Sequence, residues 1–180
     1  MFIDYKIKGK YVNLRSVEES DAEFILSVRN DPRISKYLPP LNVTVEQQRQ
    51  WISKQRADKD SYYFLLETPE GDKIGTISIY DIDGDHGEGG RTCCIGEPFA
   101  AVEASLLFHD FVFDVLGLNY TTGWVYENNK PVIALNNSFG ISWVGKNYDK
   151  NGEPYLECQM HKEPYKLNRD KILKKLRIIK

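Results

Sequence analysis

The sequence predicts a single α/β domain with a mixed, mostly antiparallel β-sheet and helices on both of its faces. Length and composition support one folded domain, because the 180 residues contain no linker or repeat and are 41% hydrophobic and 28% charged. The order of the predicted elements indicates the sheet type: strand, two helices, three antiparallel strands, helix, strand, helix and hairpin. Only one strand-helix-strand unit requires a parallel pair, so most neighbouring strands are expected to be antiparallel.

The first part of the chain predicts one strand and two helices. Residues 11–15 have the pattern of a strand, and Ser20 with Glu23 forms a capping box for the first helix. The Asn-Asp-Pro run at 30–32 ends or interrupts that helix, and a second helix is expected over residues 44–57.

A hairpin and a loop are predicted next. Strands at 62–66 and 73–80 are joined by a turn at 69–72, which predicts an antiparallel pair. Residues 81–90 are polar and rich in glycine, so we expect an exposed loop before a third strand at 91–95.

A long apolar helix is expected from about residue 102 to 115, with Gly117 as its C-cap and a strand at 120–126 after it. Together with the strand at 91–95, it forms a unit whose two strands should be parallel and joined by a right-handed crossover.

The last predicted elements are a helix at 131–138, stopped by Gly140, and a terminal hairpin. Its strands cover residues 141–148 and 155–161, and Asn151-Gly152 supplies the turn between them.

Positive charge is concentrated at the C-terminal end. The chain carries a net charge of -2, but its last twenty residues contain eight Lys or Arg against two acidic residues, so they carry +6 and the rest carries -8. Apolar residues recur there at helical spacing: Ile172, Leu173, Leu176 and Ile179. We therefore expect a domain over residues 1–168, a basic amphipathic helix over 169–180 packed on it, and no nucleic-acid partner.

Composition also bears on compartment and metals. Mean hydropathy is -0.48 and no long apolar run occurs, so no membrane span is expected. The first residues lack the pattern of a signal peptide, which favours a cytoplasmic protein. Cys93, Cys94 and Cys158 offer neither a disulfide framework nor a zinc pair, and no metal is expected. A monomer and a homodimer both remain open.

Three stretches resemble one known family. The run Asn129 to Ile141 is similar to its cofactor-binding motif, residues 14–22 to the start of its first helix, and residues 108–118 to its central helix and exit. The family is the GNAT superfamily of acyl-CoA-dependent N-acetyltransferases, particularly the branch related to the ribosomal-protein N-terminal acetyltransferases. The resemblance spans about residues 10–162.

The resemblance implies a GNAT-like fold with one splayed parallel strand pair, formed here by residues 91–95 and 120–126. Unpaired backbone groups of such strands can bind the amides of the pantetheine arm, and a helix N-terminus can bind the pyrophosphate. The resemblance implies acetyl-CoA as a co-substrate and no other cofactor. The cofactor-binding residues that this implies are Cys94, Ile95, Gly96, Phe99, Ala100, Ala101, Val102, Asn129 and Asn136.

The phosphate-binding loop departs from the family pattern. The chain passes from Ile95-Gly96-Glu97-Pro98 directly into Phe99 and Ala100, which makes the loop about four residues short and removes its glycines. Two interpretations stay open: a tighter turn holds the pyrophosphate with fewer amides, or cofactor binding is lost.

Transfer of an acetyl group to an amine needs a proton acceptor and gains from a proton donor for the thiolate. Glu97 follows the splayed strand and is the candidate base. Asn136 occupies the position at which the family often has a tyrosine, so Tyr126 is the candidate acid; water in its place, or a thiolate that leaves without a proton donor, are the open alternatives. A backbone N–H near Cys94 or Ile95 would stabilise the charge that develops on the thioester carbonyl.

The acidic segment before the third strand is a candidate substrate site. Asp81, Asp83 and His86 could bind a cationic amine, whereas the spacing lacks the glutamate that a calcium loop requires. His109 lies inside the apolar helix and is interpreted as a hydrogen-bonded core histidine.

The leading hypothesis is an N-acetyltransferase that moves an acetyl group from acetyl-CoA to a primary amine, which is an amino sugar, another small amine or a protein N-terminus. The alternative is a catalytically inactive GNAT-fold module for binding or assembly. A third interpretation is an unrelated α/β ligand-binding domain.

Overall fold

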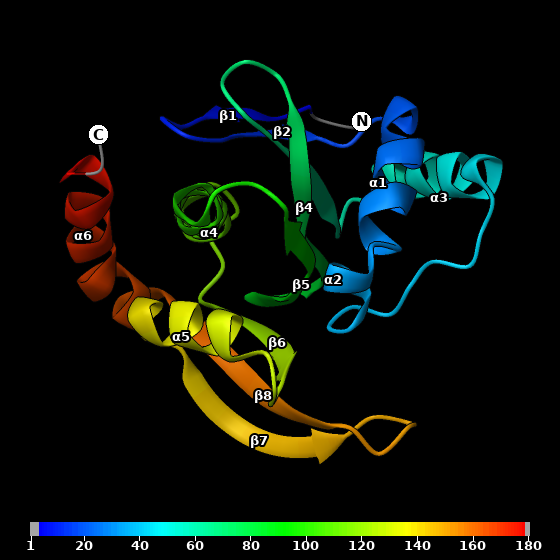
Figure 1. Ribbon diagram of the computed structural model, residues 1–180. Coiled ribbons are helices and arrows are strands. Elements are labelled where there is room, and N and C mark those ends of the chain that lie inside the picture. The colour runs from blue at the N-terminus through cyan, green and yellow to red at the C-terminus, as the bar shows by residue number, and fades with distance from the viewer. Residues whose placement is uncertain (1–3, 179–180) are drawn as a thin grey trace.

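The computed structural model describes residues 4–178 and contains one eight-stranded sheet in the order β1-β2-β3-β4-β5-β6-β8-β7 (Figure 1). The predicted mixed, mostly antiparallel sheet is confirmed, because only β5 and β6 pair in parallel among the described strands. The strands are β1 (Lys6–Lys8), β2 (Asn13–Ser16), β3 (Tyr62–Glu67), β4 (Lys73–Asp83), β5 (His86–Cys94), β6 (Tyr120–Tyr126), β7 (Ser142–Tyr148) and β8 (Pro154–His161).

Helices cover both faces of this sheet. They are α1 (Ala22–Arg29), α2 (Pro32–Ser35), α3 (Val45–Ala57), α4 (Pro98–Asp110), α5 (Lys130–Phe139) and α6 (Lys162–Ile178). A 3-10 turn, η1 (Glu19–Asp21), precedes α1, and a π-helical turn, η2 (Phe111–Val115), follows α4. None of the helices between residues 4 and 178 has the length and apolar character needed to cross a bilayer.

Local signals define several boundaries as expected. Thr44 caps α3 by accepting a hydrogen bond from the Gln47 N–H at 3.2 Å, and the Gln47 side chain accepts one from the Thr44 N–H at 2.8 Å. Gly140 ends α5 in the left-handed conformation, with φ of +84°, which a residue with a Cβ adopts at a cost.

The first helix begins differently from the expectation. The predicted capping pair of Ser20 and Glu23 is wrong, because the Asp21 carboxylate accepts the Glu18 N–H at 2.8 Å and the first turn starts at Glu19. The preceding strand at Lys6–Lys8, which pairs with β2, was too short and too polar for the sequence pattern to indicate.

The predicted loop at residues 81–90 is also wrong, because it forms the end of β4 and most of β5. Its turn is confined to Gly84 and Asp85. Two of the other glycines lie where neighbours leave no room for a side chain: a Cβ at Gly87 would be 3.0 Å from Ile79, and one at Gly90 would be 2.6 Å from the Tyr80 hydroxyl. These glycines therefore serve close packing within a strand rather than a flexible turn.

The central helix starts at Pro98 rather than near residue 102, and it gives way to the π-helical turn at Phe111. Proline is favoured in the first helical turn because its φ already suits a helix and its missing N–H has no helical partner there. Only residues 95–97 then connect β5 to α4.

The core has one part on each face of the sheet. The larger part packs α4, η2 and α6 against the strands and includes Phe64, Phe111 and Tyr165. The smaller one packs α1 and α3 around Ile25 and Ile52. Figure 1 shows α1 and α3 on the side of the sheet away from α4.

The C-terminal helix begins at Lys162, seven residues before the expected start at 169, and contacts α4, α5 and β8. Its buried residues include Ile172 and Leu176. Arg169 donates two hydrogen bonds of 2.6 Å to the Asp110 carboxylate at the end of α4. Two predictions fall partly outside the described part of the chain. They are the lack of a signal-peptide pattern, which involves residues 1–3, and the end of the expected helix at residues 179–180.

A buried carboxylate joins β2, η1 and β4. Asp21 is fully buried and accepts two hydrogen bonds from the Arg15 guanidinium, at 2.7 and 2.8 Å, and one ion pair from Lys73 at 2.7 Å. Burial alone raises the pKa of Asp21, but the hydrogen bonds from Arg15 and Lys73 outweigh it, so the pKa lies below its usual value.

We predict that Asp21→Asn lowers the free energy of unfolding at pH 7 by about 3 kcal/mol, because it leaves two cations without their buried partner. A carboxyl with a lowered native pKa stabilises the fold above its unfolded pKa and loses this effect as pH falls through the native value. The difference between wild type and variant should therefore shrink below about pH 4. Urea unfolding at several pH values measures it, and a difference that stays constant down to pH 3 contradicts the prediction.

Candidate active site

The sheet opens between β5 and β6. The two strands pair at only three positions, His86 with Tyr120, Gly87 with Thr121, and Glu88 with Thr122. Beyond these pairs, β6 continues its ladder with β8 as far as Tyr126, while β5 keeps only β4 as a neighbour. The expected splayed parallel pair is thus present, but the paired residues of β5 lie at 86–88, in the segment predicted as a loop, rather than at 91–95. Beyond them, the edges with which β5 and β6 face each other have no strand between them.

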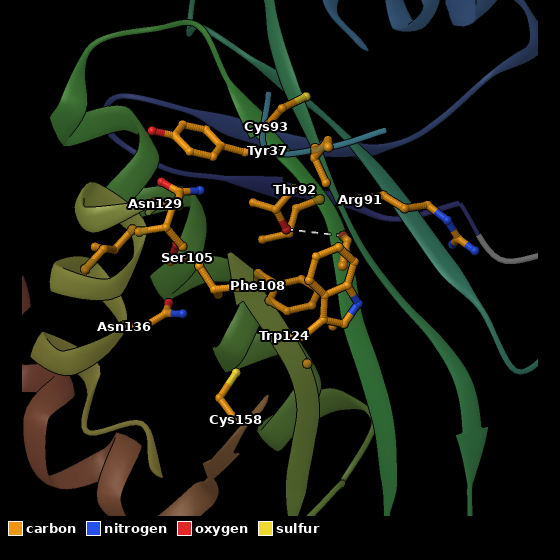
Figure 2. Close-up of a pocket in the computed structure, with 18 of the residues that line it drawn as sticks. Tyr37, Arg91, Thr92, Cys93, Ser105, Phe108, Trp124, Asn129, Asn136 and Cys158 are labelled. Carbon is orange, nitrogen blue, oxygen red and sulfur yellow. Dashed lines mark hydrogen bonds between the residues drawn. The ribbon is translucent and has the colours of Figure 1, made fainter. Parts of the chain in front are cut away.

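A cavity of about 390 Å³ lies at this opening (Figure 2). Its lining comes from the segment around α2, from β5 and β6, and from the facing sides of α4 and α5. Figure 2 shows Asn129 and Asn136 on the α5 side, with Arg91 across the cavity beyond Thr92 and Trp124. Elements distant in the sequence therefore meet at one hollow in the middle of the sheet.

A β-bulge shapes the β5 wall of the cavity. Thr76 faces Cys93 and Ser78 faces Gly90, so β5 has an extra residue between these pairs, and Arg91 has a φ of +50°. The Thr76 and Ser78 hydroxyls donate to the carbonyl oxygens of Arg91 and Gly90 at 2.7 and 2.9 Å. The carbonyl groups of the bulge are therefore hydrogen-bonded to β4, and the opposite edge of β5 faces the cavity.

Three residues expected to bind the cofactor line the cavity: Cys94, Asn129 and Asn136. Asn129 occupies the N-cap position of α5, but its side chain makes no capping hydrogen bond. Its amide therefore does not cap the helix, in line with the binding role that the resemblance implies.

The other expected cofactor residues lie at the start of α4, outside the cavity. Gly96, Phe99 and Ala100 line a second hollow of about 260 Å³, and the Phe99 ring packs on Tyr11 with their centroids 4.7 Å apart. Ile95 is 46% exposed, and Ala101 and Val102 are half-buried in the helix.

This helix start offers few donors to an anion. Pro98 has no N–H, and the N–H groups of Ala100 and Ala101 both point to the Glu97 carbonyl, at 2.9 and 3.4 Å. The opening between the strands thus fits an amide-bearing arm, whereas the start of α4 fits a pyrophosphate poorly.

Glu97, the expected base, does not reach the cavity. It is exposed at the N-cap of α4 and lines the second hollow instead. The reason is the early start of α4, which turns the chain away from the opening immediately after β5.

Tyr126, the expected acid, does line the cavity. Its hydroxyl donates a hydrogen bond to the Asp149 carboxylate at 2.9 Å. Burial and the neighbouring Asp149 raise the pKa of Tyr126, so the phenol keeps its proton at neutral pH.

The expected substrate-binding residues Asp81, Asp83 and His86 lie at the β4–β5 turn, at the opposite end of β5 from the opening. His86 stacks on Tyr120, with ring centroids 4.9 Å apart. None of the three lines the cavity. The long β4–β5 hairpin, where a loop was expected, carries them away from it.

A tyrosine and a glutamate that the sequence did not single out lie beside the opening. Tyr80 lines the cavity, and its hydroxyl donates to the Glu88 carboxylate at 2.7 Å. Burial and Glu88 both raise the pKa of Tyr80. Without knowledge of the bulge, no sequence signal indicates that these side chains meet.

His109 lines the floor of the cavity from α4. Its Nδ1 is 2.7 Å from the Ser105 carbonyl oxygen, and burial lowers its pKa to about 4. The ring is therefore neutral at pH 7, in line with a hydrogen-bonded histidine of the packed helix.

The cysteines are free thiols, and burial raises the pKa of Cys158 to about 12, which keeps it protonated. No group of three or more His, Cys, Asp or Glu side chains that could hold a metal occurs within residues 4–178.

Comparison with known proteins agrees with this architecture. A family model described as an acetyltransferase (GNAT) domain matches residues 12–142. One curated relative is the SPbeta prophage-derived uncharacterized N-acetyltransferase YokL of Bacillus subtilis, which is 25% identical over 144 residues, covering 77% of this chain and 80% of that protein.

Solved structures share the fold. Apo FdhC, described as a nucleotide-linked sugar GNAT, has a TM-score of 0.82 at 24% identity and covers 97% of this chain and 99% of its own. Spermidine N-acetyltransferase from Vibrio cholerae, in complex with CoA and spermine, has a TM-score of 0.75 at 17% identity, with 87% of this chain and 99% of that chain covered.

Ribosomal-protein-S5-alanine acetyltransferase from Vibrio fischeri has a TM-score of 0.76 at 18% identity, with 90% of this chain and 99% of that chain covered. These identities support a shared fold and leave the acceptor open. Because the family model matches well over half of the sequence, from β2 to the start of β7, the chain belongs to the GNAT acetyltransferase family.

Proposed function

We propose that this protein is an acetyl-CoA-dependent N-acetyltransferase that acts on a primary amine. The observation that carries the proposal is the cavity at the opening between β5 and β6, where strand edges without a partner face Asn129 and Asn136 of α5. Amide groups of an extended ligand can pair with such edges as another strand would.

The thioester of acetyl-CoA supplies an acetyl group whose C–S bond breaks as the C–N bond to the amine forms. Backbone N–H groups of β5 near Cys94 are suited to stabilise negative charge on the carbonyl oxygen, because this stretch of the strand borders the cavity. The neutral amine loses one proton in the process, and the thiolate gains one.

Tyr80 and Glu88 are suited to take the amine proton. Tyr80 lines the cavity, and its hydroxyl donates a hydrogen bond to Glu88. A proton can therefore pass from the amine to the Tyr80 oxygen as the phenol proton moves to the carboxylate, so no free phenolate is formed. Glu88 acts through Tyr80 and is a positioning residue.

Tyr126 is suited to protonate the thiolate, since its raised pKa keeps the proton available at neutral pH. Asp149 orients the Tyr126 hydroxyl through a 2.9 Å hydrogen bond. During the transfer, this hydroxyl must turn from Asp149 to the sulfur.

A catalytically inactive binding module is the second candidate, and the start of α4 favours it. Pro98 and the engaged N–H groups of Ala100 and Ala101 leave little to hold a pyrophosphate, so cofactor affinity decides between the two functions.

We predict that acetyl-CoA and free CoA each raise the melting temperature of the protein in a saturable way at micromolar concentrations, because a ligand of the folded state stabilises it. Asn129→Ala should weaken this response by about tenfold in concentration, through loss of a side-chain hydrogen bond. Asn13→Ala, on β2 and outside both hollows, is the matched control. The absence of a shift up to millimolar cofactor would favour the inactive module.

We also predict that Glu88→Gln lowers kcat by about a hundredfold, because an amide cannot accept the proton that passes through Tyr80. Glu97→Gln, the same change outside the cavity, should leave kcat within about twofold. Steady-state acetylation with one amine acceptor measures both. Equal losses in the two variants, or loss only in Glu97→Gln, would contradict the assignment.

A further inference from the structure

The cavity carries positive charge at the end away from α5. Among the described residues that line it are Arg33 and Arg91, but no Asp, Glu or Lys. Arg33 is 77% exposed and forms an ion pair with Asp31 at 2.7 Å, so its charge is already matched. Arg91 takes part in none of the ion pairs formed within residues 4–178.

Aromatic rings hold the Arg91 guanidinium in place. Its central carbon lies 3.9 Å from the ring centroid of Tyr80, 5.2 Å from that of Trp51 and 6.0 Å from that of Tyr63. These contacts stabilise the cation without using its N–H groups as hydrogen-bond donors to an anion. Within residues 4–178 the guanidinium has one polar contact, a long one of 3.5 Å from Nη1 to the Ser78 hydroxyl.

The backbone conformation of Arg91 is costly. A φ of +50° is rare for a residue with a Cβ and strains the backbone. The bulge that imposes this backbone conformation is held by hydrogen bonds, because two buried hydroxyls donate to the carbonyl oxygens of Gly90 and Arg91. Strain of this kind, kept by well-ordered surroundings, is typical of a site that must aim a particular side chain.

Arg29 is a second arginine that forms no ion pair with a carboxylate among the described residues, and it lies near the β5 side of the cavity. Arg29 is 92% buried, its Nη2 donates to the Pro39 carbonyl at 2.8 Å, and its Nε has no hydrogen-bond partner. Burial raises the pKa values of Tyr63 and Cys93, and the positive charge of Arg29 opposes this rise, so the cation lies near both. Tyr63 contacts Arg91 and Cys93 lines the cavity, so an anion there would be attracted by both arginines.

We propose that the acceptor amine also bears an oxyanion, as a phosphate or a carboxylate, and that Arg91 binds this group. The inference rests on the proposed function, because it takes the amine to lie at the opening between the strands. In Figure 2 the Arg91 side chain extends away from Asn129 and Asn136, which places the anion at the far end of the acceptor from the cofactor side. A polyamine would find no carboxylate on the described lining.

The test compares paired acceptors that differ in one charge: glucosamine 6-phosphate with glucosamine, and glycine with glycinamide. The kcat and KM of each are measured for wild type, Arg91→Gln, Arg91→Lys and the matched control Arg49→Gln, whose residue lies on α3 outside the cavity. Thermal melting verifies that each variant folds. The two pairs distinguish a phosphate from a carboxylate.

We expect wild type to prefer the charged member of one pair, and Arg91→Gln to lower kcat/KM for it by about tenfold or more, mainly through KM. Arg91 also packs on Tyr80, so Arg91→Gln should lower kcat/KM for the neutral acceptors as well, but clearly less than for the charged one. In Arg49→Gln, whose cation is exposed and paired with Glu46, both should change by less than about twofold. Arg91→Lys, which keeps the charge but not the fork, should fall between wild type and Arg91→Gln.

Equal use of charged and neutral acceptors by wild type would overturn the inference. So would an equal loss on both members of a pair in Arg91→Gln, or a loss of acetyl-CoA affinity in its place. If no amine is acetylated, the proposed function fails, and calorimetry with glucosamine 6-phosphate tests the anion site separately. Saturable binding that Arg91→Gln weakens supports the site, and no binding by wild type overturns it.

Discussion

One interruption in the hydrogen-bond ladder, after Glu88 and Thr122, determines the arrangement of the whole site. Each of the two strands keeps a ladder on its outer side, β5 with β4 and β6 with β8, so the sheet remains intact while its centre opens. Backbone groups in the interior of a sheet are rarely left without partners. An extended ligand rich in amides meets this need, which links the fold to the cofactor class without any side-chain signature.

The opening stays in place because α4, which connects the two separated strands, is fixed along its length. Near its start, the buried Glu103 carboxylate accepts the N–H groups of residues 10, 11 and 12, at 3.0, 2.5 and 3.0 Å. At its end, Asp110 receives Arg169 and lies 2.9 Å from the Tyr165 hydroxyl, both on α6. The floor of the cavity, with Ser105, Phe108 and His109, lies between these two anchors and is held at a set distance from the strands.

Local signals predicted the elements whose boundaries depend on local chemistry. Thr44 and Gly140 mark helix ends by hydrogen bonding and by backbone conformation, and both are visible in sequence. The glycines of β5 and the proline of α4 were misinterpreted because their reasons are tertiary: Gly90 makes room for Tyr80, and Pro98 starts a helix where a loop was expected. The same holds for the cavity lining: the bulge and the early start of α4, which the sequence does not indicate, place Tyr80 and Arg91 on the lining and Glu97 outside it.

Local rather than total charge determines which acceptor the cavity can accept. A net charge of -2 and an acidic β4–β5 turn suggest attraction of a cation, but charges exposed at a turn are screened within about 8 Å at physiological ionic strength. The carboxylates that contact lining residues are engaged, Glu88 by Tyr80, Asp31 by Arg33 and Asp149 by Tyr126, and none of them lines the cavity. Arg91 is less screened there because aromatic rings surround it. Among the described residues, the formally charged side chains of the lining are therefore arginines, opposite in sign to the net charge of the protein.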